Sequence, residues 1–346
     1  MAVVHLLSVA PTWRPPKWDH LMALRTMTQN AARDRFKMHT LAGDPSAADV
    51  ILFCETHHAD TSAGPLLEMI RRHPVYRAHR EKSFVFCGID RPVAFIPGVY
   101  SSIPKRWYRR EFARCTCYLL MKNELLNDAA IQAPGVVPKW LGSFVGSAWT
   151  DPVRGELMKV KDERLLLADN SEAFVAAVKR NDKPAVAEFK RQYVQTTLES
   201  KFILCPRGYG AASIRLFEAM ELGRVPVIIS DQWVEPEGPD WSSCSIRIAE
   251  RDVANTAKIL HEHEPRWPAM AAAAKQVWSD WFSEETLFHR TVESCLDIAK
   301  SSRWSKWYAR RLADVQMLKP ANARLWWRWK KYERVLNAPE LPEPSP

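Results

Sequence analysis

Short apolar runs alternate with helical patterns along most of the chain. This alternation predicts βαβ units, in which parallel strands are buried on both faces of a sheet. We expect a helix over 65–73, a mainly helical stretch over 103–127, and helices between the later strands. The runs predicted to form strands are residues 3–9, 50–54, 83–87, 93–96, 139–147, 165–167, 202–205, 225–229 and 245–248. The predicted fold class is therefore α/β.

A loop that contains Pro134 and Pro138 separates two cycles of this pattern. With 346 residues, 47% of them apolar, the chain can bury a large core, and its length favours two domains. We predict one domain over 1–138, a second over 139–300, basic Trp-rich helices over 301–336 and a disordered, proline-rich tail over 337–346.

Cysteine usage and the first residues bear on the compartment. The seven cysteines are scattered and several lie in apolar runs, as expected of small core residues in a reduced, cytoplasmic protein. Cys115 and Cys117 have no second Cys/His pair at zinc spacing, so we expect no metal there. The apolar start of the chain lacks a basic leader and is followed by Pro11, which indicates a first strand rather than a signal peptide. No apolar window approaches the roughly 18 to 20 residues that cross a bilayer.

The segment "LCPRGYGAASIRLFEAMELGRVPVIISD", residues 204–231, has the pattern strand, glycine turn, helix, strand. Gly208 and Gly210 allow the turn to approach a ligand closely, and Gly223 follows the predicted helix. The unpaired N–H groups at a helix N-terminus favour an anion, and Arg207 and Arg215 add two permanent charges.

Two further side chains extend this chemistry towards a nucleotide. The Ser213 hydroxyl is suited to capping the helix or binding a phosphate, and the Glu218 carboxylate to binding the paired hydroxyls of a ribose. An ordinary alternative remains, because glycine turns of this kind are common and Arg215 with Glu218 at i, i+3 also fits a surface ion pair.

The stretch "SKFILCPRGYGAASIRLFEAMELGRVPVIISDQWVEPEGPDWSSCSIRIAERDV", residues 200–253, resembles the exostosin family of glycosyltransferases. It shares a Cys-Pro-Gly turn, a Ser-x-Arg helix, a Pro-Val-Ile strand and an Ile-x-Glu-x-Asp-Val segment with that family. "SFVGSAWTDPVRGEL", residues 143–157, is similar to the segment that opens the family's nucleotide-binding half. The resemblance covers about 110 residues, 139–253, and is faint before them.

The resemblance implies a GT-B-like architecture: two Rossmann-type domains face a central cleft, and C-terminal helices cross back. It also implies an inverting reaction with a UDP-sugar held by the second domain. Many retaining GT-B enzymes carry a glutamate eight positions before the one that Glu218 matches, and Gly210 stands there. The donor-binding residues that it implies are Arg207, Gly208, Ser213, Arg215 and Glu218, with Gly146, Ser147 and Arg154 on the facing loop.

An inverting transfer needs a base and a means of stabilising the departing diphosphate. The sequence has no Asp-x-Asp pair to hold a metal, so we expect arginines and a helix N-terminus to act instead, with no metal and no cofactor besides the donor substrate. The base should lie at the carboxyl end of a first-domain strand. The candidates are Asp90, followed by Glu55 and His57.

The net charge of +9 lies mostly in residues 301–336, where ten Lys and Arg face two acids, a net charge of +8. Trp304, Trp307 and Trp329 recur with other residues at helical spacing, which predicts two amphipathic helices broken near Pro320. These helices either pack on the first domain or dock on an anionic membrane. Nucleic-acid binding is not expected, because no recognised nucleic-acid fold accompanies the basic segment.

The leading hypothesis is an inverting, metal-independent glycosyltransferase that moves sugar from a nucleotide sugar to a glycan or lipid-linked acceptor in surface polysaccharide synthesis. We expect it in the cytoplasm or peripheral on the inner face of the membrane. Two alternatives stay open. The first is an inactive GT-B module that binds nucleotide or glycan as a scaffold, and the second is a transferase that uses a GDP-sugar.

Overall fold

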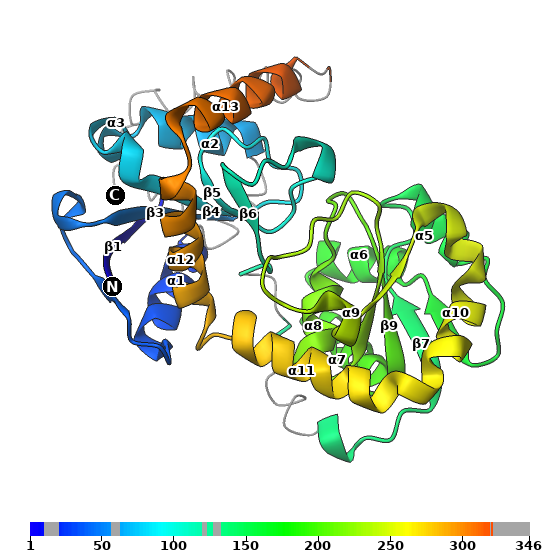
Figure 1. Cartoon of the computed structure of the whole chain (residues 1–346). Helices are drawn as coiled ribbons and strands as arrows, with labels where there is room; N and C mark the ends of the chain where they lie inside the picture. The colour runs from blue at the N-terminus through cyan, green and yellow to red at the C-terminus, as the bar shows by residue number, and fades with distance from the viewer. Residues whose placement is uncertain (10–20, 57–62, 120–122, 127–132, 319, 321–346) are drawn as a thin grey trace, which may run out of the picture.

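In a computed structural model, the chain forms two parallel β-sheets, each covered by helices, which lie side by side (Figure 1). The structure describes residues 1–9, 21–56, 63–119, 123–126, 133–318 and 320. The predicted tail over 337–346 and the second helix of the basic segment lie outside these residues.

The first sheet has the strand order β2-β1-β3-β4-β5-β6, and every neighbouring pair is parallel. The second sheet has the order β11-β10-β9-β7-β8, again all parallel. The strands of the first sheet are β1 (Ala2–Leu7), β2 (His39–Leu41), β3 (Val50–Thr56), β4 (Ser83–Gly88), β5 (Gly98–Tyr100) and β6 (Ala113–Cys115). Those of the second are β7 (Trp140–Val145), β8 (Leu165–Ala168), β9 (Ser200–Pro206), β10 (Val225–Ile229) and β11 (Ile246–Ile248).

Each sheet reverses its strand order once. The chain adds β2 on one side of β1 and β3 on the other, and it adds β8 on one side of β7 and β9 on the other. In open parallel sheets, the loops that leave the carboxyl ends of the two central strands diverge at this switch point and leave a crevice for a ligand. The predicted α/β architecture of two Rossmann-type domains is confirmed.

The helices lie on both faces of the sheets. The α-helices with both ends among the described residues are α1 (Met22–Arg33), α2 (Ala63–Arg72), α3 (Pro74–Ala78), α5 (Pro152–Leu157), α6 (Ser171–Lys179), α7 (Lys183–Leu198), α8 (Ile214–Glu221), α9 (Trp241–Cys244), α10 (Thr256–His263), α11 (Trp267–Trp281), α12 (Leu287–Lys300) and α13 (Arg303–Met317).

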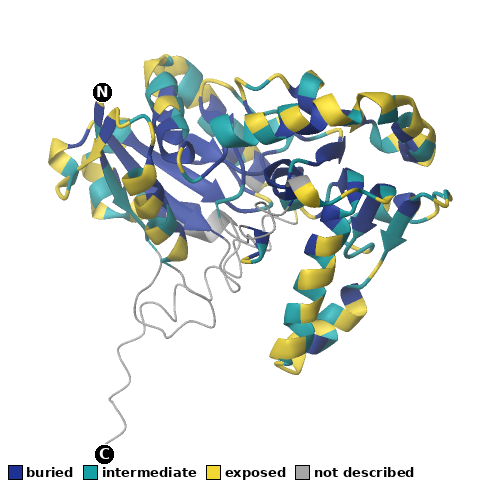
Figure 2. Cartoon of the chain, turned by 90° about the horizontal axis from the view of Figure 1, so that it is seen from below, coloured by how far each residue is buried: buried dark blue, intermediate teal, exposed yellow. Residues whose placement is uncertain are grey.

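Alternate residues of the central strands pack on opposite faces of the first sheet. Leu52 and Phe86 pack with α1 and α12, whereas Phe53 and Val85 pack with α2, α3 and α13. The strands are buried along nearly their whole length (Figure 2). Because both faces are covered, continuous apolar runs such as 50–54 signal these strands directly.

The chain returns from the second domain to the first after α11 (Figure 1). Helix α12, which the sequence analysis assigned to the second domain, contacts α1, β3 and β5 of the first. The crossing back therefore begins one helix earlier than expected. The exact boundaries at 138 and 300 stay a prediction, although the stretch between β6 and β7 does contain the predicted loop.

Two local predictions in the first domain are wrong. Residues 93–96 form no strand, and the strand beside β4 is instead β5. The stretch 103–127, expected to be helical, contains a 3-10 turn (Lys105–Trp107) and strand β6, and Leu126 is its one α-helical residue among those described. The apolar residues of 93–96 are buried but form no strand-to-strand hydrogen bonds of a sheet. This segment packs against α13 instead of alongside another strand.

Among the described helices, none has both the length and the apolar character that crossing a bilayer requires.

Candidate functional site

A cavity of about 330 Å³ opens at the switch point of the second sheet, and we call it the donor cavity. Loops that follow β7 and β9 form most of its wall, and the first domain closes one side. The lining residues are Asp90, Tyr118, Thr150, Arg154, Tyr193, Gly208, Tyr209, Gly210, Ala212, Ser213, Ile214, Arg215 and Glu218. The location is the one expected for a ligand of an open parallel sheet.

Arg154 and Arg215 place two guanidinium groups in the wall of the donor cavity. Both lie against the ring of Phe144, with Cζ 5.5 and 4.6 Å from its centroid. Within the described part of the chain, their hydrogen bonds go to backbone carbonyls and neither forms an ion pair with a carboxylate. Burial, and then the charge of Arg215, lowers the pKa of Arg154 to about 10. Two adjacent cations without a carboxylate partner form a strong site for an anion.

The start of α8 adds backbone donors to the same wall. Ser213 is the N-cap residue with an extended backbone, and its hydroxyl makes no capping hydrogen bond to a described residue. The N–H groups of Ile214 and Arg215 lie in the first turn of α8, where the helix supplies no partner, whereas Leu216 N–H donates to the Ser213 carbonyl at 3.2 Å. The Ser213 hydroxyl and the first two N–H groups are therefore placed to bind a phosphate, and the role of Ser213 stays a prediction.

Glu218 lies deeper, where the donor cavity meets a smaller apolar cavity. Its carboxylate accepts a hydrogen bond from the hydroxyl of Tyr193 on α7. Burial raises the pKa of Glu218, and the Tyr193 hydroxyl and the charge of Arg215 oppose this effect. The Arg215 guanidinium also lies 5.7 Å from the ring centroid of Tyr193. The exposed i, i+3 ion pair that was the alternative for Arg215 and Glu218 is not present.

The first domain contributes Asp90, which follows β4, and Tyr118, which follows β6. The Tyr118 hydroxyl donates a hydrogen bond of 2.7 Å to Oδ1 of Asp90. A Cβ on Gly210 would lie 2.7 Å from the carbonyl oxygen of Asp90 and 2.5 Å from Oγ of Ser102. Only a glycine at 210 allows the glycine turn, which we call the donor loop, to approach the backbone of Asp90 so closely.

Three predicted donor-binding residues lie beside the cavity rather than in its wall. Arg207 pairs with Asp151, with Nε to Oδ2 at 3.2 Å, and lies 3.8 Å from a carboxylate oxygen of Glu250. Ser147 accepts a hydrogen bond from Arg154 through its carbonyl, and Gly146 packs against the Arg215 guanidinium. The structure gives Arg154, rather than Arg207, the place beside Arg215.

The other two candidates for the base are not brought to the cavity by the described structure. Glu55 is buried at the end of β3, where its carboxylate accepts hydrogen bonds from the backbone N–H of Val9 at 2.8 Å and the hydroxyl of Ser8 at 3.1 Å. It ties the ends of β1 and β3 together. His57 lies outside the described residues.

Sequence reasoning missed several lining residues. Tyr118 and Tyr193 come from segments 75 residues apart in the sequence, and each is the hydrogen-bond donor to a predicted carboxylate. Tyr209 lies within the glycine turn, and Thr150 lies between β7 and α5. Arg91 of the first domain donates a hydrogen bond of 2.7 Å to the Tyr209 carbonyl. Nothing in their local sequence marks the tyrosines, because only tertiary packing places them at the cavity.

Comparison with known proteins supports the family resemblance. The family model of the Exostosin GT47 domain matches residues 132–263. An Exostosin-1 homolog of Caenorhabditis elegans is 41% identical over 71 residues, which are 20% of this chain and 19% of that protein. A probable glucuronoxylan glucuronosyltransferase of Arabidopsis thaliana is 42% identical over 73 residues, 20% of this chain and 15% of that protein.

Similarity to solved structures is low. The Anabaena Alr3699/HepE structure in complex with UDP and glucose overlaps 84% of this chain and 98% of that chain, with 10% identity and a TM-score of 0.40. The assignment of the fold therefore rests on the two sheets themselves.

The matched segment and the donor cavity coincide. All lining residues except Asp90 and Tyr118 lie within the span that the family model matches. The alignments with curated relatives span about a fifth or less of the length of those relatives. The match to the Exostosin GT47 model over residues 132–263 and the identity to exostosin relatives confirm the resemblance to the exostosin family over this part of the chain.

Proposed function

We propose that this chain is an inverting glycosyltransferase that moves a sugar from a UDP-sugar to a hydroxyl of a glycan or lipid-linked acceptor. The observation that carries the proposal is the pair Arg154 and Arg215 beside the uncapped start of α8, in a cavity that a first-domain carboxylate also lines. Several matched relatives are named as glucuronosyltransferases or glycosyltransferases, which supports the reaction class.

The proposed chemistry divides between the two domains. The acceptor oxygen forms a bond to the anomeric carbon while the bond from that carbon to the diphosphate oxygen breaks on the opposite face. Asp90 takes the proton of the acceptor hydroxyl, and its hydrogen bond from Tyr118 orients the carboxylate. The two arginines and the α8 N–H groups stabilise the charge that develops on the departing UDP.

The metal-independence of this step stays a proposal. Its support is that two arginines line the donor cavity and that the sequence contains no Asp-x-Asp pair. Glu218 is proposed to bind the ribose, after exchanging its hydrogen bond with Tyr193 for one from a ribose hydroxyl. A catalytically inactive module with the same cavity would bind the nucleotide but not transfer sugar.

The experiment is a thermal-shift panel of UDP, UDP-sugars, GDP and GDP-sugars on the full chain, with and without EDTA. A ligand that binds only the folded state raises the melting temperature by mass action. We expect UDP to raise it and EDTA to leave the shift unchanged. Arg215→Ala should weaken UDP binding roughly 10- to 150-fold, because a hydrogen bond to a charged group contributes about 1.5 to 3 kcal/mol.

Arg191→Ala is the matched control, because Arg191 is an exposed arginine of α7 that pairs with Glu188 on the same helix. A shift by GDP alone would move the proposal to the GDP-sugar alternative. A UDP shift that survives Arg215→Ala would remove this arginine from the site. Binding without any transfer or donor hydrolysis would favour the scaffold alternative.

We further propose that α13 docks the protein on an anionic membrane from the cytoplasmic side. Its inner face packs on the first domain through Ala309 and Ala313, as the packing hypothesis expects. Its outer face carries a continuous exposed stripe at helical spacing, which we call the α13 stripe: Trp304, Trp307, Tyr308, Arg311, Val315 and Leu318. Aromatic residues prefer the bilayer interface, and the net charge of +8 over 301–336 complements anionic lipid.

Sedimentation with vesicles tests this docking. The wild-type chain should bind phosphatidylglycerol vesicles at low salt and not phosphatidylcholine vesicles. The double variant Trp304→Ala and Trp307→Ala should lose most of this binding while keeping its UDP shift. Trp149→Ala is the control, because Trp149 is an equally exposed tryptophan outside α13. Equal binding by the double variant and the control would overturn the membrane role of the stripe.

A further inference from the structure

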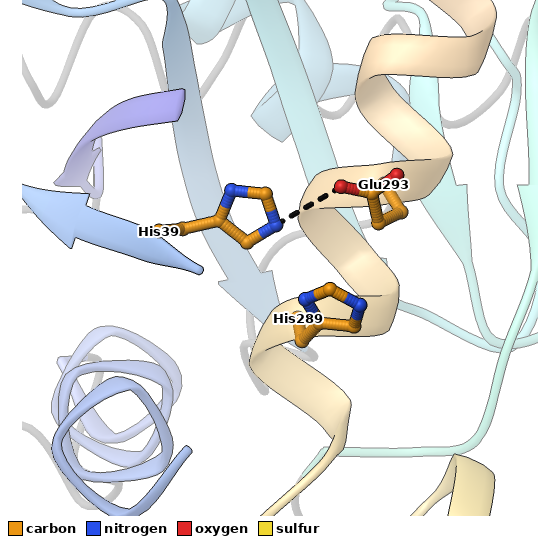
Figure 3. A group of neighbouring side chains, drawn as sticks. All are labelled: His39, His289 and Glu293. Atoms are coloured by element: carbon orange, nitrogen blue, oxygen red, sulfur yellow. Dashed lines mark ion pairs between the residues drawn. The ribbon is translucent and has the colours of Figure 1, made fainter. Parts of the chain in front are cut away.

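A second group of polar side chains lies outside the donor cavity, at the edge of the first sheet. His39 begins the edge strand β2, and His289 and Glu293 lie one turn apart on α12, so that all three meet between the strand and the helix (Figure 3). One ligand atom from each lies within 4.8 Å of the others. Nε2 of His39 is 3.1 Å from Oε1 of Glu293. None of the three lines the donor cavity.

The imidazole nitrogens of this group lack hydrogen bonds. His39 and His289 are 7% and 6% exposed. Nδ1 of His39 and Nδ1 of His289 have no hydrogen-bond partner in the described structure, and Nε2 of His39 makes only its ion-pair contact with Glu293 there. Oδ1 of the nearby Asp34, which is 1% exposed, is unpartnered as well. Buried polar atoms are almost always satisfied, so unpartnered nitrogens on two buried, neighbouring imidazoles call for a bound group.

The side chains of this group pack against one another, and they also carry the atoms that bind a metal cation. The His39 and His289 rings stack with centroids 5.0 Å apart, and Phe36 covers the other face of His289 at 4.1 Å. A neutral imidazole nitrogen is a common ligand of metal ions. Two neutral imidazoles and a carboxylate are a ligand set that zinc prefers.

We propose that His39, His289 and Glu293 bind one divalent transition-metal ion, with zinc as the expected metal. Because two ligands come from α12 and one from β2, the ion joins the helix that crosses back from the second domain to the edge of the first sheet. The positive ion also offsets the buried carboxylate of Asp34, whose charge acts on both histidines.

The location suggests a role in fixing the crossing between the domains. The segment that leads into α12 is already held on the first domain by Arg33, which pairs with Glu284, and by Arg35, which pairs with Asp280 at 2.7 Å. The backbone N–H of Arg35 also donates to the carbonyl of Glu285 at 2.9 Å. A metal ion one turn further along the chain extends this anchoring to α12 itself. The site is structural and independent of the proposed transfer reaction.

The test uses the full chain, stripped of metal with EDTA and then titrated with ZnCl2 or CoCl2. We expect one equivalent of zinc to raise the melting temperature, Mg2+ to leave it unchanged, and Co2+ to give the visible absorption of a site with nitrogen ligands. Mutation of a residue that only hydrogen-bonds to a metal ligand typically lowers metal affinity roughly 10- to 100-fold. Glu293→Gln, which removes a ligand, should therefore weaken zinc binding at least about tenfold, and His289→Ala should abolish it.

Two controls separate this site from adventitious binding. His263→Ala removes a histidine outside the group, and Cys115→Ser removes the one cysteine that the structure leaves partly exposed among the described residues. Both should keep the zinc-dependent shift. Glu293 is exposed, so Glu293→Gln is decisive even where His289→Ala fails to fold. Unchanged zinc affinity in Glu293→Gln, or the absence of any zinc-dependent shift, would overturn the proposal. The UDP shift should be the same with and without zinc.

Discussion

The two sheets share a topology but use their switch points differently. At the carboxyl ends of β7 and β9 the loops diverge around two arginines and a helix N-terminus, and they enclose the donor cavity. At the corresponding ends of β1 and β3, the buried carboxylate of Glu55 accepts hydrogen bonds from Ser8 and Val9 and joins the two strands. The same fold therefore builds an anion site in one domain and an internally satisfied carboxylate in the other.

The difference shows how the first domain takes part in the site. The first domain lines the donor cavity through Asp90, which follows β4, and Tyr118, which follows β6, and neither residue lies at the switch point of the first sheet. Asp90 lies where the glycine turn at Gly210 contacts the first domain closely. We therefore expect substitutions in the first domain to change transfer while sparing donor binding, and substitutions in the donor loop to change donor binding.

The largest expected effect is that of Asp90→Asn. An amide cannot accept the acceptor proton, and general-base catalysis contributes about 10² to 10⁴-fold. We expect the transfer rate to fall by that factor while the UDP-dependent thermal shift stays within error of the wild type. Measurement of both on one preparation separates chemistry from binding.

Glu55→Gln is the matched comparison, because it removes the charge of the other first-domain carboxylate at nearly constant volume. Transfer by the folded Glu55→Gln protein should stay close to wild type. If Glu55→Gln stops transfer and Asp90→Asn does not, the roles that we give the two carboxylates are reversed.

Gly210→Ala should have the next largest effect, because it acts on the contact between the domains. The added Cβ would lie 2.7 Å from the backbone oxygen of Asp90, so one backbone must move. A misplacement of about 1 Å can reduce a rate roughly 10²-fold. We expect a loss of that order in kcat with UDP affinity changed far less. Gly155→Ala in α5 is the control, because a Cβ there meets nothing within 4 Å.

The sequence predicted the second domain well because its signals are local. The predicted strand 225–229 has the same bounds as the observed strand β10. The glycine turn, Ser213 and Arg215 line the donor cavity at the junction of β9 and α8, as the sequence motif predicted. The first domain was predicted less well. Strands β5 and β6 have three residues each, too short for periodicity to separate them from the irregular segments around them.

The site was only partly predictable for a related reason. Arg154 and Arg207 are both arginines near the glycine turn, and the sequence cannot tell that Asp151 pairs with Arg207 and leaves Arg154 beside Arg215. The group of His39, His289 and Glu293 joins positions 250 residues apart, and it has no signal in the sequence beyond the i, i+4 spacing on α12. Such sites follow from tertiary packing rather than from local pattern.

The smallest expected effect concerns the end of the second sheet where its strands begin, opposite the carboxyl ends of the strands that border the donor cavity. There the cations are paired: the carboxylate of Glu264 bonds with Arg164, whose Nη1 donates at 2.9 Å, and with Lys201 at the start of β9. These two hydrogen bonds lower the pKa of Glu264 from its ordinary value of 4.5 to about 2. Since the partners are partly exposed, Glu264→Gln should cost only about 1 kcal/mol of unfolding free energy.

The pH dependence of that stabilisation has a definite sign. The unfolded chain binds the proton of Glu264 near pH 4.5 and the folded chain near pH 2, so the stabilisation is complete above pH 4.5 and is lost as pH falls towards 2. Urea unfolding at pH 7 and pH 3 should therefore show a smaller difference between wild type and Glu264→Gln at the lower pH. Glu262→Gln, at a more exposed neighbour, should change the stability at neither pH. UDP binding at pH 7 should be equal in all three proteins, because Arg164 and Lys201 are paired with Glu264 and do not line the donor cavity.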